Sequence, residues 1–184
     1  MSGEDIARVK SAARQLARQR RDAVDRVLGR PAAERLRAEI GPPDGHPIAA
    51  YLPIGSEIDP LPALTGWPVC LPVVEGRGQP LRFRRWEEGV PLAAGPFGTR
   101  HPERGEWVQP RYLVVPLLAF DRSCMRLGYG GGFYDRTLAM LRGFHPVRAF
   151  GFAYAAQQVP VVPVEATDAP LDAVVTERET IWRR

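Results

Sequence analysis

The first forty residues carry their apolar side chains at helical spacing, whereas the pattern after residue 47 is that of short strands. Apolar and small residues recur every three or four positions at Ile6, Val9, Ala13, Leu16, Ala17, Val24, Val27 and Leu28. This spacing predicts a helix over residues 4–28, with Ser2 as its N-terminal cap. A second helix is predicted over residues 31–40, because Pro31 suits its first position and Gly41 its end. The polar face of both helices is strongly cationic, and its simplest interpretation is a solvated surface.

Short apolar runs separated by proline and glycine predict strands in the rest of the chain. They cover residues 48–53, 67–74, 81–86, 111–120, 147–153, 173–176 and 180–183. A further helix is predicted from Phe133 to Arg142. Segments 87–110 and 154–170 are rich in proline and glycine and are predicted to be loops. Strands separated by helices favour one α/β domain over residues 1–184, with an open, mostly parallel sheet flanked by helices and an N-terminal helical segment.

The composition is that of an ordinary globular protein, with 45% hydrophobic and 25% charged residues. No run of about 18 apolar residues is present, so no membrane span is expected. The charged N-terminus lacks the apolar segment of a secretory signal, which predicts a cytoplasmic protein. Cys70 and Cys124 could form one disulfide, but reduced thiols are the preferred interpretation in that compartment. The three histidines are far apart in the sequence and predict no structural zinc.

The chain is basic, with a formal net charge of +4 and 25 basic residues. A basic chain binds nucleic acid or a smaller polyanion such as a nucleotide. No RNA-binding aromatic motif and no zinc finger is present, so a mildly basic enzyme is favoured and no nucleic-acid partner is expected. A nucleic-acid-binding module that uses the arginine-rich first helix is the alternative. Lys10 is the only lysine, which reflects either codon bias or a position that needs a compact ammonium group.

The sequence RLGYGGGFYDR at residues 126–136 is the strongest candidate for a ligand site. It follows a predicted buried strand and opens a predicted helix. Glycines allow the backbone to turn so that successive amides point into one concavity, and the helix adds its own unpaired amides. Such a loop binds phosphate oxygens. It matches neither the Walker A loop nor the dinucleotide fingerprint, and a tight turn without a ligand is the alternative.

The charged residues beside the glycines point to ATP with magnesium. Arg126 and Arg136 can pair with phosphate oxygens. Asp135 lies in the first turn of the predicted helix, where it would also favour the helix dipole. A carboxylate beside bound phosphates is repelled unless a cation lies between them, and Mg²⁺ held by one or two carboxylates together with phosphate oxygens provides that cation.

This glycine segment, preceded by VVPLLAFD at residues 114–121, resembles the 5-formyltetrahydrofolate cyclo-ligase family. Lys10 and Arg14 match an early K-x-x-x-R, residues 51–57 match a Y-L-x-x-x-x-E stretch, and residues 151–177 match the closing pattern. The resemblance implies a Rossmann-like sheet of the NagB/RpiA/CoA-transferase type. It also implies ATP- and Mg²⁺-dependent conversion of 5-formyltetrahydrofolate to 5,10-methenyltetrahydrofolate, with ADP and phosphate as products.

The resemblance implies a role for each matched residue. The ATP-binding residues would be Lys10, Arg14, Arg126, Gly128, Gly130, Gly131, Gly132, Tyr134 and Asp135. The electrostatic catalysts among them would be Lys10, Arg14 and Arg126. The folate-binding residues would be Leu52, Glu57, Tyr129 and Phe133. Mg²⁺ would be held by Asp135 and Asp172. The expected partners are these small molecules, and the expected state is a monomer or a weak homodimer.

Two positions depart from the family pattern. Many relatives have glycine where Cys124 stands, and relatives often have glutamate before proline where His101 precedes Pro102. These departures leave a second interpretation open, a family relative that binds ATP but acts on another substrate or has a regulatory role.

Overall fold

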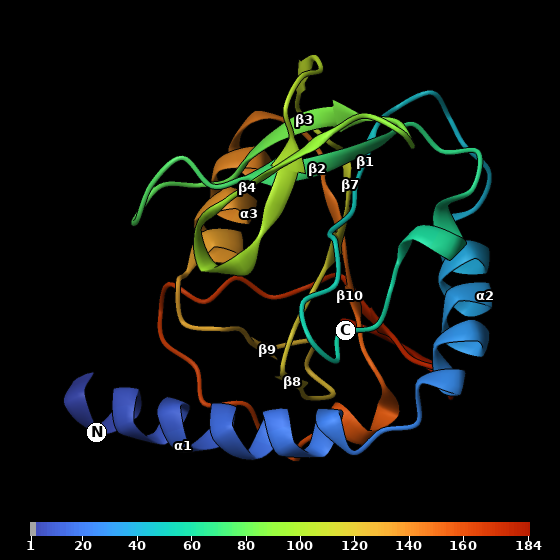
Figure 1. The fold of residues 1–184 in the computed structure, drawn as a ribbon. Helices are drawn as coiled ribbons and strands as arrows, with labels where there is room; N and C mark the ends of the chain where they lie inside the picture. The colour runs from blue at the N-terminus through green and yellow to red at the C-terminus, as the bar shows by residue number, and fades with distance from the viewer. Residues whose placement is uncertain (1–2) are drawn as a thin grey trace.

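The computed structural model describes residues 3–184, which build one eight-stranded sheet with helices on both faces (Figure 1). The strand order is β12-β11-β10-β7-β1-β2-β3-β6. Their bounds are β1 (Ile48–Ala49), β2 (Val69–Val73), β3 (Arg82–Trp86), β6 (Trp107–Val108), β7 (Tyr112–Val115), β10 (Arg148–Phe152), β11 (Ala173–Val175) and β12 (Thr180–Trp182). The five strands from β11 to β2 are parallel, and the remaining strands pair antiparallel at the two edges. The predicted fold class, an open and mostly parallel α/β sheet, is therefore confirmed.

Two small sheets and seven helical segments complete the described chain. The small sheets pair β4 (Leu92–Ala94) with β5 (Arg100–Pro102), and β8 (Ala119–Phe120) with β9 (Arg126–Leu127). The α-helices are α1 (Gly3–Asp22), α2 (Gly29–Ile40) and α3 (Phe133–Phe144). The 3₁₀ turns are η1 (Arg26–Leu28), η2 (Leu61–Leu64), η3 (Pro96–Gly98) and η4 (Ala155–Gln157). None of the helices within residues 3–184 has both the length and the apolar character needed to cross a membrane.

Strand alternation divides the core between two helices. Ile48, Val114 and Phe150 are fully buried on the face that α2 covers through Leu36. The neighbouring residues along the same strands, among them Ala49, Leu113 and Ala149, pack instead with Leu138 and Leu141 of α3. Because successive side chains of a strand point to opposite faces, the continuous apolar runs serve both layers. The short parallel strands need such two-sided burial.

The first helix is shorter than predicted. It ends at Asp22, and the chain re-enters a helical turn at η1, where the Asp25 carboxylate accepts a hydrogen bond from the Val27 amide at 3.0 Å. Val27 and Leu28, which were predicted to continue the first helix, therefore belong to the separate turn η1. The second helix begins at Gly29, so Pro31 is its third residue and not its first. The proposed cap Ser2 lies outside the described residues.

One predicted strand and one predicted loop are also corrected. The run at 111–120 divides into β7 and β8 around Pro116, which has no amide proton for a sheet ladder. The glycine loop therefore follows β9 of a hairpin. Segment 87–110, predicted to be a loop, contains the short strands β4, β5 and β6. These strands have only two or three residues each, which is too short to show a clear period-two pattern.

The turn that joins β8 to β9 places Cys124 in a left-handed conformation, with φ of 59°. The side chain is fully buried, and its thiol lies 3.3 Å from the Ile181 carbonyl oxygen, to which it donates. Burial raises the pKa of Cys124 to about 11, so the thiol stays protonated at neutral pH. Glycine is the residue that adopts this backbone conformation without a steric penalty.

Cys124→Gly is expected to be more stable than Cys124→Ala, by about 1 kcal/mol, because only alanine keeps the Cβ atom that the positive φ disfavours. Both variants lose the buried sulfur equally. Urea denaturation of the two proteins measures the difference in unfolding free energy.

Cys70 is the matched control, since it is equally buried but lies in β2 without a positive φ. There the order should reverse, with Cys70→Gly less stable than Cys70→Ala by roughly 0.5–1 kcal/mol. The same order at both positions would contradict the strain at Cys124.

Candidate functional site

Helix α1 lies across one end of the sheet and brings cations to the glycine loop (Figure 1). It packs against η4, which follows the carboxyl end of β10. The Nε atom of Arg14 donates to the Gly128 carbonyl oxygen at 2.9 Å. The structure thus joins two predicted ATP-binding segments, the K-x-x-x-R helix and the glycine loop, at the carboxyl end of the strands, where ligands of open α/β sheets bind.

The backbone of the glycine loop is open to a ligand. Gly130 and Gly132 have φ values of 99° and 62°, and Gly132 directly precedes α3. No hydrogen bond between residues 3–184 starts from an amide of residues 128–132. Tyr129, Gly130 and Gly131 are exposed. Free amides beside the N-terminus of a helix are suited to bind an anion.

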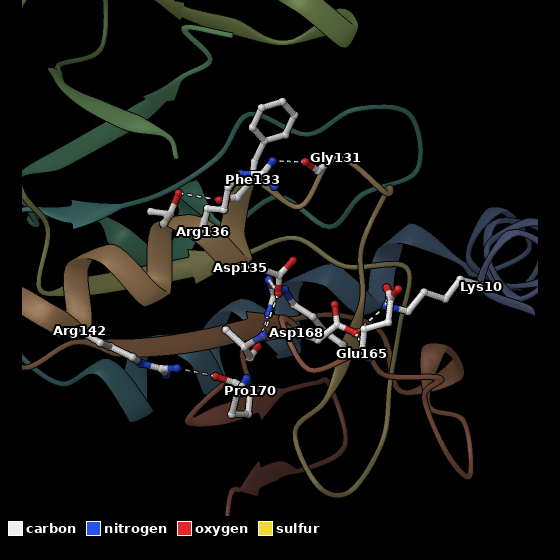
Figure 2. Close-up of polar contacts among 12 residues, drawn as sticks. Lys10, Gly131, Phe133, Asp135, Arg136, Arg142, Glu165, Asp168 and Pro170 are labelled. Carbon is white, nitrogen blue, oxygen red and sulfur yellow. Dashed lines mark hydrogen bonds and ion pairs between the residues drawn. The ribbon is translucent and has the colours of Figure 1, made fainter. Parts of the chain in front are cut away.

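Arg126 and Asp135 form an ion pair of 2.7 Å beneath this loop. The Arg126 side chain is only 4% exposed, and it also donates to the Ala169 carbonyl oxygen. The Ala169 amide in turn donates to Asp135 at 3.0 Å. The buried Arg126 side chain therefore links β9 to α3 and to residue 169. Arg136 turns back on the loop, where it donates to the Gly131 carbonyl oxygen (Figure 2).

Lys10 is buried between two carboxylates that the sequence analysis did not single out. Its Nζ lies 2.6 Å from Glu165 and 2.6 Å from Asp168 (Figure 2). Burial alone would lower the pKa of Lys10, but the hydrogen bonds and charges of Asp168 and Glu165 raise it. The 165–169 segment therefore links Lys10 of α1 to Asp135 of α3. The sequence signal for this contact was the acidic pair Glu165 and Asp168 in a proline-rich stretch. Spacing in the sequence does not show which residue such a pair contacts.

Asp172 is not brought to Asp135. Its carboxylate accepts from Arg142 at 2.9 Å and from the Ala149 amide at 2.7 Å. Arg142 lies in the last turn of α3, whereas Asp135 lies in the first. The acidic residue that lies beside the glycine site is Asp168, one position before the Ala169 amide that Asp135 accepts. The two predicted metal ligands are thus separated, because Asp135 belongs to the first turn of α3 and Asp172 is held by Arg142 of the last turn.

The predicted folate-binding residues Glu57 and Tyr129 are in direct contact. The Tyr129 hydroxyl donates to the Glu57 carboxylate, which also accepts from the Ile54 amide at 2.8 Å. Burial raises the pKa of Glu57, and burial together with the charge of Glu57 raises the pKa of Tyr129. A buried carboxylate that already accepts two hydrogen bonds is well suited to receive further N–H donors.

The remaining predicted residues pack against the two halves of the core. Leu52 is half-buried against the α2-side core, and Tyr134 packs into the α3-side core, where burial raises its pKa. The Phe133 ring meets Phe97 of the β4–β5 hairpin with centroids 5.8 Å apart. A hollow of about 610 Å³ lies beside α2, and Glu57 forms part of its wall.

Comparison with known proteins identifies the family of this chain. Residues 7–177 match the model of the 5-formyltetrahydrofolate cyclo-ligase family. The chain belongs to that family. It is 33% identical to the 5-formyltetrahydrofolate cyclo-ligase of Escherichia coli K12 over 181 residues, which cover 90% of this chain and 98% of that protein. It is 34% identical to the enzyme of the same name from Mycolicibacterium smegmatis over 188 residues, which cover 92% and 88%.

Solved cyclo-ligase structures have the same fold. The 5,10-methenyltetrahydrofolate synthetase of Aquifex aeolicus superposes with a TM-score of 0.75 and 29% identity, over 96% of this chain and 93% of that one. The synthetase of Mycoplasma pneumoniae gives a TM-score of 0.73 at 22% identity, over 92% and 99%. The family resemblance inferred from the glycine segment is confirmed.

The two departures from the cyclo-ligase pattern lie at different distances from the site. Cys124 is in the β8–β9 turn, immediately before Arg126 and the glycine loop. His101 is half-buried in β5, paired with Ala93, and its hairpin carries Phe97 to Phe133. Of the two, only the hairpin of His101 contacts a residue predicted to bind folate.

Gly130→Ala is expected to lower the unfolding free energy by about 1–3 kcal/mol, because alanine does not tolerate the positive φ. The new Cβ atom would also lie 3.2 Å from the Cζ atom of Arg14. Gly128→Ala is the control within the same loop, since its φ is not positive and no atom lies within 4 Å of the added carbon. Chemical denaturation compares the two, and equal losses would contradict the role of the backbone at residue 130.

Proposed function

We propose that this chain is a 5-formyltetrahydrofolate cyclo-ligase that uses ATP to form 5,10-methenyltetrahydrofolate, ADP and phosphate. The observation that carries the proposal is the glycine loop, whose free amides adjoin Arg14 of α1 and the N-terminus of α3. Membership of a family of ATP-dependent cyclo-ligases supports it. Residues 1–184 would act as one catalytic domain on two small molecules in the cytoplasm, as a monomer or a weak homodimer.

The reaction needs activation of a formamide, whose oxygen is a poor leaving group. The γ-phosphoryl group of ATP passes to the formyl oxygen, and ADP leaves. N10 of the same folate then attacks the formyl carbon and gives up its proton, and the C–O bond to the phosphorylated oxygen breaks with release of phosphate, which carries that proton away. Nucleophile and electrophile share one molecule, so the protein needs to position them and stabilise charge, without a covalent side-chain intermediate.

The loop amides and the neighbouring cations supply that stabilisation. Amides of residues 128–132 would donate to the transferring phosphoryl group, whose charge grows during transfer. Arg14 lies against this loop. Lys10 has three N–H donors, of which Glu165 and Asp168 accept two, so one donor remains for a phosphate oxygen. Arg126 would act indirectly, because its ion pair holds the Asp135 carboxylate in place.

The acidic residues fit Mg²⁺ shared with phosphates, since carboxylate oxygens are the ligands it prefers. Within residues 3–184, no group of three or more acidic, histidine or cysteine side chains could hold a metal ion. Asp135 and Asp168 together match instead the usual arrangement of one or two carboxylates completed by substrate phosphates. We assign the second carboxylate to Asp168 in place of Asp172. Mg²⁺ would neutralise the charge of the bound phosphates.

Glu57, Tyr129, Leu52 and Phe133 would hold the folate. Glu57 would accept hydrogen bonds from the N–H edge of the pterin, while the side chains of Leu52 and Phe133 contact its rings. Because Tyr129 belongs to the glycine loop and bonds to Glu57, the folate and the phosphates would be bound on either side of one residue. That placement suits transfer of a phosphoryl group from one substrate to the other.

The direct test is the appearance of methenyl absorbance when the purified protein receives 5-formyltetrahydrofolate, ATP and Mg²⁺. Product formation should require all three components. Nucleotide binding without methenyl product would contradict the proposed substrate and favour a relative that acts on another compound. Neither binding nor product would contradict the ATP site itself.

Asp135→Asn and Asp168→Asn should each lower Mg²⁺-dependent turnover at least about a hundredfold, the loss expected when a developing phosphoryl charge is left unneutralised. Asp172→Asn should retain most of the turnover, because that carboxylate serves Arg142. Titration of activity with Mg²⁺ compares the three proteins, and circular dichroism checks that each is folded. A severe loss in Asp135→Asn and Asp172→Asn, with turnover retained in Asp168→Asn, would restore the original metal pair.

A further inference from the structure

We propose that Arg21 is a positioning residue that holds Glu57 and Tyr129 in one geometry and keeps Glu57 ionised for folate binding. The inference rests on the proposed function, since it concerns the folate side of the same site. Neither the family pattern in the sequence nor the predicted site residues included Arg21. It was one of many arginines on a helix whose polar face was interpreted as solvated.

Arg21 is buried and uses its planar guanidinium in three directions. Its side chain is 6% exposed and that of Glu57 is 4% exposed. One terminal nitrogen donates to the Tyr129 hydroxyl at 2.6 Å, and the same nitrogen lies 3.7 Å from the Glu57 carboxylate. Nε donates to the Ser56 hydroxyl at 3.0 Å. Ser56 itself donates to Asp22, so the group is anchored at both ends.

These contacts join three segments that are far apart in the sequence. Arg21 ends α1, Ser56 and Glu57 follow β1, and Tyr129 belongs to the glycine loop. The Tyr129 ring also lies beneath the cations of α1, with the guanidinium carbons of Arg18 and Arg21 each 5.7 Å from its centroid. A fork of fixed donors is suited to such a junction, and a flexible ammonium group is not.

The charge of Arg21 has a second effect, on the protonation of Glu57. Burial raises the pKa of Glu57, whereas the Tyr129 hydrogen bond and the nearby Arg21 charge lower it. The buried phenols Tyr51 and Tyr134, whose pKa values the Glu57 charge raises, are neutral at physiological pH. The hollow beside Glu57 is also lined by the charged side chains Arg26, Arg30, Glu34, Arg37 and Asp59. Arg21 is the cation that forms an ion pair with Glu57, and its charge opposes the desolvation of this carboxylate. Without it, the pKa of Glu57 rises further and less of the carboxylate is ionised at a given pH.

Arg21→Met removes the charge and the fork but keeps an unbranched side chain. It should raise KM for 5-formyltetrahydrofolate about tenfold or more, the loss expected for hydrogen bonds to a charged group, with KM for ATP unchanged. The acid limb of the pH profile of kcat/KM for the folate should move to higher pH. Arg21→Lys loses the fork of donors but keeps the charge. It should therefore raise the folate KM while the acid limb stays near its wild-type position.

Arg20→Met is the matched control, because Arg20 is the neighbouring arginine on the same helix and is exposed. It should behave as the wild type in every measurement. Ser56→Ala provides a variant in which the guanidinium remains but loses one anchor. It should raise the folate KM without a shift of the acid limb, and it carries the test if Arg21→Met does not fold.

An unchanged folate KM and an unshifted acid limb in folded Arg21→Met would overturn the proposal. So would an equal rise in both KM values with an unshifted limb, which is the result of a purely structural role. A wild-type protein that forms no methenyl product would contradict the proposed function instead. In that case NMR titration of ¹³C-labelled glutamate in the ligand-free protein still decides, since the Glu57 pKa must be higher in Arg21→Met than in the wild type.

Discussion

Helix α1 is attached to the sheet mainly through buried charge, and the site depends on this attachment. Its inward face carries Lys10, Arg14, Ala17 and Arg21, which recur at helical spacing. Lys10, Ala17 and Arg21 are buried, whereas Val9 and Leu16 are about half exposed. A buried cation without a partner is costly, so each needs an acceptor on the body of the protein. The acceptors are Glu165 and Asp168, the Gly128 carbonyl group, and the Tyr129–Glu57 pair.

The sheet could be predicted from the sequence more fully than the way in which α1 is attached to it. The parallel sheet could be predicted, because continuous apolar runs such as 111–120 have few alternatives to burial between two layers. The orientation of α1 could not. Its apolar residues Val9 and Leu16 suggested an inward face, but ion pairs with distant segments outweigh the burial of two side chains. Helical periodicity measures only apolar burial, so it located the buried Ala17 but missed the two buried cations on the same face.

The same limit applies to the acids that we propose as Mg²⁺ ligands. Asp168 and Asp172 lie four residues apart in one segment of uniform composition, and nothing local distinguishes them. The fold does, because the chain passes Asp135 at Ala169 and reaches the start of β11 by residue 173. Asp168 then faces Lys10, while Asp172 faces Arg142 and the start of β10. Long-range pairing decides which acid lies beside Lys10 and which beside Arg142, and a single sequence does not contain that pairing.

The glycine loop shows how ligand and protein requirements coincide at one backbone. Gly130 has a positive φ, and its missing Cβ leaves the space in which the Arg14 guanidinium lies. Gly128 offers its carbonyl oxygen to the same arginine. The loop thus binds a cation through its carbonyl group and exposes its amides to an anion. A phosphate bound there would be close to Arg14 without any rearrangement of the helix. The cation and the amides are therefore preorganised together, so little reorganisation has to accompany the growth of charge during phosphoryl transfer.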